Sequence, residues 1–406
     1  DIQEWKVNFY RSLPRGTRSQ IVWGGFDRSN PCWICQFGTL KGIQGIEQKG
    51  SFEFLPTLVG SQASELDESG TLKNGNSSGE PSLGIKYNFS SSRVAEITIN
   101  PDFSQVEADE EQVDVNTTFA LHYPEKRPFF NEGADLINTP INVVYTRSIN
   151  NPTGAGRIIN RGKKDNWVLL SAFDEDSPYI IPGEEQSFTR LGGKSSSNIF
   201  RYKRALNDGS FLGLIATDRR MVNNNGSGSV VGFDTHYRFN DKYQVEFQSV
   251  FSHTQEPNDS TLVSSATFGD NHTFTFDGES FSGNAVKIEF DRNTEHWRLE
   301  AGYDHKTPTF RAENGFESSN NSRRIFGQSV WIYHPDNFFK QVIGGFHTGV
   351  EHNFGGEQKA KYIVGFGNLS MPRQTRLQFQ YARRLQYRFK DMELNGTYDL
   401  KLNLNS

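Results

Sequence analysis

The fold is decided by residues 231–251, which read VGFDTHYRF at 231–239 and YQVEFQSVF at 243–251. In both runs apolar or aromatic side chains recur at every second position, except for Thr235 and Ser249, and most positions between them carry Gly, Asp, His, Arg, Gln or Glu. Because successive side chains of a β-strand point to opposite faces, each run predicts a strand with one apolar and one polar face. Asn240 and Asp241 between them favour a turn, so the stretch predicts an antiparallel hairpin.

The same alternation returns at residues 286–291, 297–304, 377–381 and 394–404. A soluble sandwich would turn the apolar faces inward, whereas a membrane barrel would turn them to lipid and the charged faces to a wet lumen. The period alone does not separate these two structures. Recurring strands joined by short turns and long polar loops, with Trp297 and Tyr333 near strand ends, favour an antiparallel outer-membrane β-barrel of roughly 14–18 strands.

The composition excludes several classes of protein. Only 34% of the 406 residues are hydrophobic, and no run of about 18 apolar residues exists, so the chain is not a helical membrane protein. Aromatic residues reach 13%, which is more than disordered chains carry. The net charge is −5 and no basic block stands out, which argues against nucleic acid as a partner.

Residues 1–406 are expected to form one barrel that long polar loops interrupt. These loops are expected at residues 61–81, 148–165, 174–199, 254–282 and 312–324. Residues 101–140 differ because they hold few alternations and much acid and Pro, and we expect an irregular, plug-like insertion there. The chain stops at Asn405-Ser406 inside an alternating pattern without a terminal aromatic residue, so the barrel is expected to be incomplete at its C-terminal end.

The two cysteines stand close together as Cys32-Trp-Ile-Cys35. No βαβ pattern surrounds them, and Gln36 follows where covalent haem attachment would need His. A zinc ribbon would need a second Cys or His pair nearby. A small-loop disulfide in an oxidising compartment is the preferred interpretation, and a redox-active or metal-linked pair is the alternative.

Acidic side chains gather at the start of the 101–140 stretch. Clustered carboxylates on irregular backbone suit Ca²⁺, and Asp102, Glu107 and Asp109 are the candidate ligands. The spacing does not follow an EF-hand loop. A solvated or salt-bridged turn is the preferred interpretation. Structural calcium is the alternative, and it is the one cofactor that the sequence suggests.

Charges of both signs follow around Pro124 and Pro128. The cluster consists of Glu125, Lys126, Arg127, Glu132 and Asp135. One interpretation is a lumenal constriction that lines a permeation path. The preferred interpretation is a set of ion pairs that fixes a plug.

Glu132 and Asp135 could in principle form the carboxylate pair of a glycoside hydrolase. That chemistry needs two carboxyl groups at a set separation across a sugar, which closeness in sequence does not show. The chain has no His-Glu-x-x-His motif and no phosphate-binding loop. We therefore predict no catalytic residue, and the protein is not expected to be an enzyme.

Residues 102–109 and 123–133, the latter reading Tyr-Pro-Glu-Lys-Arg-Pro-Phe-Phe-Asn-Glu-Gly, resemble a signature of the DUF5916 family. Further similar stretches lie at residues 37–46, 53–56, 198–204, 212–217, 297–303 and 310–316. The resemblance implies an outer-membrane barrel of a Gram-negative bacterium and implies no known activity. Members usually carry an N-terminal periplasmic domain resembling a family 9 carbohydrate-binding module, which is absent here apart from a strand near residues 5–11.

The pattern and the resemblance together predict an outer-membrane channel or surface scaffold that handles polar solutes such as glycans. One alternative is a carbohydrate-binding or glycoside-processing protein. Another is a barrel sheath or assembly component for a protein partner. The expected partners are accordingly outer-membrane lipid, a polar solute or glycan, and other proteins.

Overall fold

A wide antiparallel sheet dominates the computed structural model of the protein. The structure describes residues 3–13, 19–27, 33–44, 50–66, 72–101, 120 and 122–405, apart from 207–208, 224, 241, 260–263, 265, 336 and 391. The strands of the wide sheet are β5 (Ser51–Leu66), β6 (Leu72–Ser90), β7 (Arg93–Ile99), β8 (Pro152–Arg161), β9 (Asp165–Asp174), β12 (Ser195–Ala205), β13 (Phe211–Met221), β14 (Ser227–Phe239), β15 (Tyr243–Gln255), β18 (Ser280–Asn293), β19 (Trp297–Lys306), β20 (Ser322–Tyr333), β21 (Gln341–His352), β22 (Gln358–Ser370), β23 (Arg376–Phe389) and β24 (Met392–Asn405).

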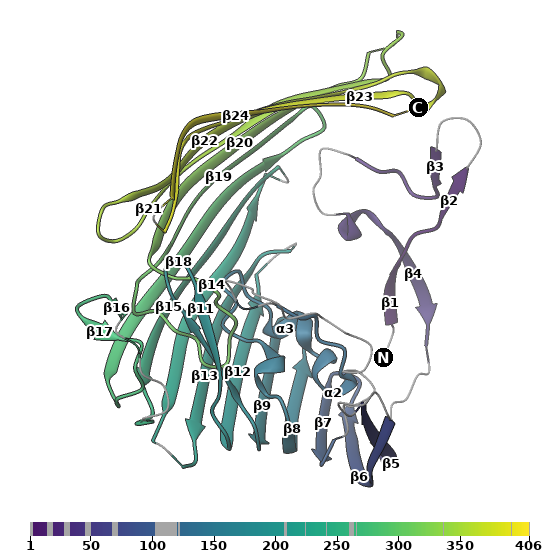
Figure 1. Ribbon diagram of the computed structural model, residues 1–406. Coiled ribbons are helices and arrows are strands. Elements are labelled where there is room, and N and C mark those ends of the chain that lie inside the picture. The colour runs from purple at the N-terminus through teal and green to yellow at the C-terminus, as the bar shows by residue number, and fades with distance from the viewer. Residues whose placement is uncertain are drawn as a thin grey trace.

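These 16 strands follow one another across the sheet in chain order, from β5 at one edge to β24 at the other. The all-β, antiparallel class predicted from the sequence is confirmed, and the strand number lies within the expected range. Figure 1 shows the sheet curling around an interior. Among the described residues, β5 and β24 are not hydrogen-bonded to each other, so the sheet is open and closure into a barrel is not confirmed.

Smaller elements accompany the sheet. β1 (Gln3–Val7) pairs with β4 (Gly38–Ile43), β2 (Tyr10–Leu13) with β3 (Ser19–Val22), β10 (Pro178–Pro182) with β11 (Ser187–Leu191), and β16 (Thr267–Phe268) with β17 (His272–Thr273). The helices are η1 (Ile34–Gln36), α2 (Pro128–Asn131), α3 (Ala134–Ile137), η2 (Thr146–Ser148) and η3 (Pro372–Gln374). Within the described ranges, no helix is long and apolar enough to cross a membrane. In Figure 1, β1 to β4 lie on the open side of the curled sheet.

The chain-order arrangement gives the sheet two different ends. At the short-turn end, the connections include residues 162–164, 240–242 and 294–296. At the long-connection end, they include residues 100–151 and 175–194, and also 256–279 and 307–321. Outer-membrane barrels have the same asymmetry, with short periplasmic turns and longer extracellular loops.

Side chains alternate between an outer, convex face of the sheet and an inner, concave face. On β13, Leu212 and Leu214 are 40% and 52% exposed, whereas Ile215 and Arg219 are 2% and 1% exposed. Neighbouring strands repeat the alternation, since Phe200 of β12 is exposed beside the buried Ile199. The outer face is therefore apolar and uncovered, and the inner face holds the buried side chains.

The hairpin that decided the sequence prediction follows this rule. β14 and β15 pair from Ser227↔Gln255 to Phe239↔Tyr243, which places the turn where it was predicted. Val231 and Phe233 are 56% and 39% exposed, while Asp234 next to them is 1% exposed. In this sheet the apolar side chains are the exposed ones and the carboxylate is the buried one.

Two of the predicted loops are wrong in extent. Residues 61–81 belong mainly to β5 and β6, which stay paired as far as Leu66↔Leu72. Residues 148–165 contain the whole of β8. Ser, Gly and Asn have weak strand propensity, but the ladder hydrogen bonds to neighbouring strands outweigh that local preference.

Candidate functional site on the inner face

The inner face of the sheet is partly filled by residues 122–149, called here the inward segment. It belongs to the long connection between β7 and β8, and α2 and α3 lie against the sheet in Figure 1. Pro128 begins α2, where its missing N–H costs no helical hydrogen bond. Gly133 joins the two helices at φ 88°, and a Cβ there would come within 2.8 Å of Ile159 Cδ1. A glycine is therefore required both by the backbone conformation and by the close approach to β8.

An apolar core forms between the inward segment and the sheet. Phe130 and Val143 of the segment are 1% and 0% exposed. They belong to one core cluster with inner-face residues of the sheet, namely Ile159, Val168, Leu170, Ala172, Ile199, Ile215, Val230, Val250 and Ala285. The inner-face positions of β8 to β18 that carry these apolar residues are thus the ones that the segment covers.

Contacts within the inward segment stabilise its own conformation. Arg127 is 4% exposed and pairs with Glu125 at 2.7 Å. Its guanidinium also donates hydrogen bonds to the carbonyl oxygens of Thr146 and Ile149, both at 2.7 Å. Burial alone would raise the pKa of Glu125, but the hydrogen bonds and charge of Arg127, with a hydrogen bond from Thr146, hold that pKa below its ordinary value.

Glu132 ties the segment to the neighbouring strands. Its carboxylate accepts hydrogen bonds from Arg157 of β8 at 2.7 Å and from Lys86 of β6 at 3.1 Å. The Arg157 guanidinium also pairs with Glu96 of β7 and donates to the carbonyl of Phe129. This buried arginine therefore joins two strands to α2.

Asp135 makes a separate connection farther along. Both of its carboxylate oxygens accept hydrogen bonds from Arg161, at 2.7 and 2.8 Å, and Lys203 donates to its carbonyl oxygen at 3.1 Å. The hydrogen bonds from Arg161 hold the pKa of Asp135 below its ordinary value. Glu132 and Asp135 are thus engaged by different cations.

The deepest polar contact lies beneath α3. Arg201 of β12 and Asp234 of β14 are 0% and 1% exposed, and they form two parallel hydrogen bonds of 2.5 and 2.7 Å. Arg201 also donates to the carbonyl of Leu136 at 3.1 Å. Nearby, the backbone N–H of Ile141 donates to Gln248 of β15 at 2.6 Å. Inner-face polar groups therefore hold the backbone of the inward segment in a fixed position.

A second element folds inward at the long-connection end. The β10–β11 hairpin belongs to the connection between β9 and β12, yet Glu184 at its tip accepts a hydrogen bond from Lys359 of β22 at 2.6 Å. Glu185 pairs with the same lysine. A cavity of about 600 Å³ lies here between the hairpin tip, Phe268 and Arg388. The hairpin thus connects two distant parts of the curled sheet.

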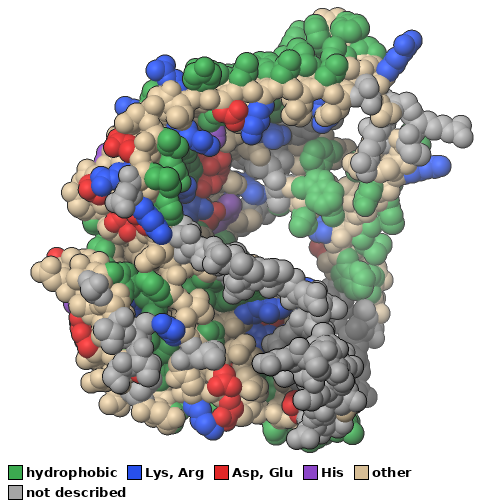
Figure 2. Space-filling view, viewed as in Figure 1, with side chains coloured by type: hydrophobic (Ala, Val, Ile, Leu, Met, Phe, Trp, Pro, Cys, Tyr) green, Lys and Arg blue, Asp and Glu red, His purple; other side chains and the backbone are tan. Residues whose placement is uncertain are grey.

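The inner face of the remaining strands is open and polar. A cavity of about 430 Å³ there is lined in part by Gln244, Asp291, Arg298, Glu300 and Gln328. Figure 2 shows the contrast between the faces: hydrophobic side chains follow the outer rim at the top of the view, and charged side chains gather inside the hollow.

The sequence-predicted residues fall into three groups. The charged cluster lies within the described residues: Lys126 is exposed, and the contacts of Glu125, Arg127, Glu132 and Asp135 are those given above. The candidate calcium ligands Asp102, Glu107 and Asp109 lie outside the described residues. Cys35 lies in η1, but Cys32 is also outside the described residues, so the disulfide stays a prediction.

Sequence reasoning missed Arg201, Asp234 and Gln248. Asp234 and Gln248 occupy polar positions of the correctly predicted hairpin, which is the one local signal that they carry, whereas Arg201 lies in β12, which was not among the predicted strands. Only the strand register and the path of the inward segment show that they are buried together.

The fold and site define a class: an all-β protein whose curled antiparallel sheet is apolar outside and holds a segment of its own chain inside. The model of a domain of unknown function, DUF5916, matches residues 55–167. This range contains β6 to β8 and the inward segment, so the family predicted from the sequence is confirmed over these residues.

Solved structures resemble the protein at low identity. Pseudomonas aeruginosa OccK8 (OprE) has a TM-score of 0.39 and 10% identity, with 99% of this chain and 97% of that chain covered. Acinetobacter baumannii OccAB3 has a TM-score of 0.38 and 9% identity, covering 90% and 89%. OmpT, an outer membrane protein of Vibrio cholerae, has a TM-score of 0.26 and 9% identity, covering 88% and 97%. No curated protein matches the chain. All three TM-scores are below 0.5, so these likenesses assign no function to the chain.

Proposed function

We propose that the protein is an outer-membrane channel of a Gram-negative bacterium, and that the inward segment narrows its lumen. The observation that carries the proposal is the inverted placement of side chains. Leu214 and Phe233 are exposed on the outer face, whereas Arg201 and Asp234 are buried on the inner face. A soluble protein would leave this apolar surface in water, while a bilayer would cover it.

The boundaries of the apolar surface support the same proposal. Aromatic side chains gather near the short-turn end, where Trp297 of β19 pairs with Trp331 of β20 and Tyr333 is 63% exposed. At the other end of β13, Asp218 and Arg220 pair on the outer face. An apolar band between an aromatic girdle and a charged rim is the surface that a barrel presents to lipid.

The solute is inferred from the inner face. The lining of the 430 Å³ cavity includes three amides, two arginines and two carboxylates, and Phe366 adds an aromatic surface. Groups of both signs and amides suit neutral or zwitterionic polar solutes better than simple anions. We therefore propose polar solutes, with small glycans among them.

Planar-bilayer conductance and liposome swelling with the full-length protein test the proposal. We expect discrete conductance steps, and swelling in the presence of small sugars. If the protein inserts into the bilayer but neither signal appears, the channel is excluded. A surface scaffold or an assembly component for a protein partner would then be the remaining function.

The role of the inward segment needs its own variants. Replacing Glu132→Gln together with Asp135→Asn removes charged contacts between the inward segment and strands β6 to β8. The segment should then detach from the inner face of the sheet more often, and the single-channel conductance should rise. Asp218→Asn is the matched control, because that carboxylate lies on the outer face. Unchanged conductance in the double variant would contradict a narrowing role for the segment.

A further inference from the structure

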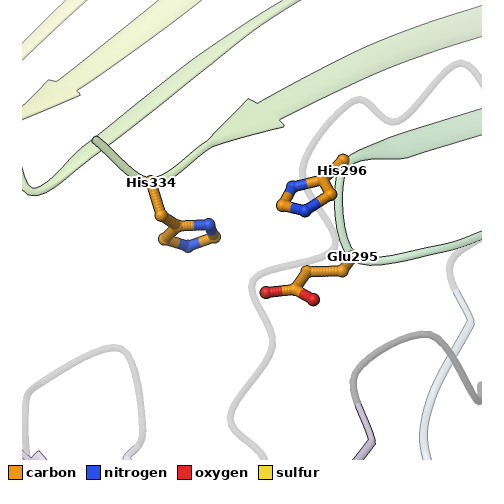
Figure 3. A group of neighbouring side chains, drawn as sticks. All are labelled: Glu295, His296 and His334. Atoms are coloured by element: carbon orange, nitrogen blue, oxygen red, sulfur yellow. The ribbon is translucent and has the colours of Figure 1, made fainter. Parts of the chain in front are cut away.

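A group of possible metal ligands stands at the short-turn end, away from the inward segment. It consists of Glu295 and His296 from the β18–β19 turn and His334, which follows β20. One ligand atom from each residue lies within 4.8 Å of the others. Figure 3 shows the Glu295 carboxylate and the two imidazole rings facing a common space.

The turn that carries Glu295 and His296 is held by hydrogen bonds to neighbouring residues. Thr294 is 8% exposed, and its hydroxyl donates to the carbonyl of Trp297 at 2.6 Å. The His296 carbonyl accepts a hydrogen bond from the N–H of Ile332 at 2.8 Å. The turn is therefore bound to the last residues of β20, two positions before His334.

The hydrogen bonds of the rings leave nitrogen atoms free for a metal. His296 Nδ1 lies 3.2 Å from the carbonyl oxygen of Ile332. A carbonyl can only accept, so Nδ1 carries the proton and Nε2 keeps its lone pair. This ring–carbonyl contact is the arrangement that orients metal-binding histidines in proteins.

His334 is placed in a similar way. Its Nε2 lies 3.0 Å from the side-chain amide of Gln341, and its Nδ1 is buried without a hydrogen-bond partner among the described residues. The Gln341 atom that lies against this Nε2 is the amide nitrogen. Amide nitrogen and oxygen are interchanged by a 180° turn of the amide; with the oxygen facing the ring, His334 Nε2–H donates to it and Nδ1 is left with a lone pair. A bound cation would give this buried nitrogen the partner that it lacks.

We propose that Glu295, His296 and His334 bind a divalent transition-metal ion of the Zn²⁺ class. Two imidazole nitrogens and one carboxylate oxygen are a ligand set that suits Zn²⁺, with the fourth position open to water. Bond lengths of about 2.0–2.1 Å in a tetrahedral site place the ligand atoms about 3.3 Å apart. The ligand atoms lie within 4.8 Å of one another, so the side chains, chiefly that of Glu295, would have to move closer to reach that spacing. The ion joins the β18–β19 turn to the connection after β20 and so stabilises the rim of the sheet.

Metal titration of the full chain tests the site independently of any channel activity. After treatment with a chelator and its removal, isothermal titration calorimetry with ZnCl₂ in detergent micelles should give about one ion per chain. His296→Ala and His334→Ala should each weaken binding at least about tenfold, since loss of even a partner of a metal ligand has that effect. Ca²⁺ and Mg²⁺ should not compete, because they prefer sites made of oxygen ligands alone.

Controls separate the site from general histidine binding. His347→Ala, on β21 outside the group, should leave binding unchanged, and far-ultraviolet circular dichroism should show the same β content in every variant. Glu295→Gln keeps the size of the side chain and should weaken Zn²⁺ binding with the fold intact. Absence of stoichiometric Zn²⁺ binding, or binding that survives both histidine replacements, would overturn the proposal.

Discussion

The two halves of the curled sheet have the same strand pattern but different interiors. From β8 to β15 the inner face packs against the inward segment, and residues such as Ile199 and Val230 are each 1% exposed. From β19 to β24 the inner face is largely open, and β24 has no buried residue. Both halves keep apolar side chains on the outer face. The difference shows that burial of the inner face comes from the inward segment and not from the alternation itself.

The largest expected effect compares a buried ion pair in the covered half with an exposed one in the open half. Asp234→Asn leaves the fully buried Arg201 without its carboxylate, which should lower the free energy of unfolding by about 3–5 kcal/mol. Asp304→Asn removes the partner of Arg324, whose side chain is 45% exposed, and should cost about 0–1 kcal/mol. Urea unfolding in lipid vesicles measures both. Equal losses would remove the distinction between the halves.

The outer faces of the two halves should lose similar stability when a charge is introduced. Leu214→Arg in the covered half and Ile363→Arg in the open half each place a charge on the outer face, which should cost about 2–4 kcal/mol near the bilayer midplane. Val222→Arg is the control, because this exposed residue lies just beyond β13. A change there should stay within about 0.5 kcal/mol. If vesicle-inserted protein tolerates the strand variants, the outer face does not contact lipid.

A smaller difference is expected from single methyl groups on the inner face. Ile199→Val removes a methyl group from the core under the inward segment and should cost about 0.5–1.5 kcal/mol. Ile343→Val, at the open cavity, should change stability by less than about 0.5 kcal/mol. The same unfolding experiment measures both variants. A loss for Ile343→Val as large as that for Ile199→Val would contradict the difference in packing between the two halves.

The smallest expected effect is acid loosening of the inward segment. Because the Arg161 hydrogen bonds lower the pKa of Asp135 in the folded state, the pair stabilises the fold fully above the ordinary Asp pKa of about 4. That stabilisation is lost as the pH falls through the lowered folded-state pKa. Protease cleavage of the segment should therefore change little from neutral pH down to about pH 5 and rise below about pH 4. Asp135→Asn should remove part of this acid dependence, and an unchanged profile would contradict the assignment.

The candidate site was only partly predictable. Glu125, Arg127, Glu132 and Asp135 could be singled out because dense charge on irregular backbone is visible along the chain. Their partners could not be predicted. Glu125 pairs with Arg127 within the inward segment, whereas Glu132 and Asp135 pair with Arg157 and Arg161, which come from β8. The Glu295, His296 and His334 group was missed for the same reason, since β19–β20 pairing brings its members together.

The sequence by itself determined the antiparallel strands, their two unlike faces and the resemblance to the DUF5916 family, because a period of two and a local motif need no distant contacts. Only the tertiary structure decided which inner-face side chains are buried and which charged residues are buried as ion pairs. Those outcomes depend on where residues 122–149 lie against β8 to β15. The pairing of Arg201 with Asp234 also depends on the register that runs from β12 through β13 to β14. The alternation along the strands specifies the two faces of the sheet, and the path of the inward segment specifies which part of the inner face is buried.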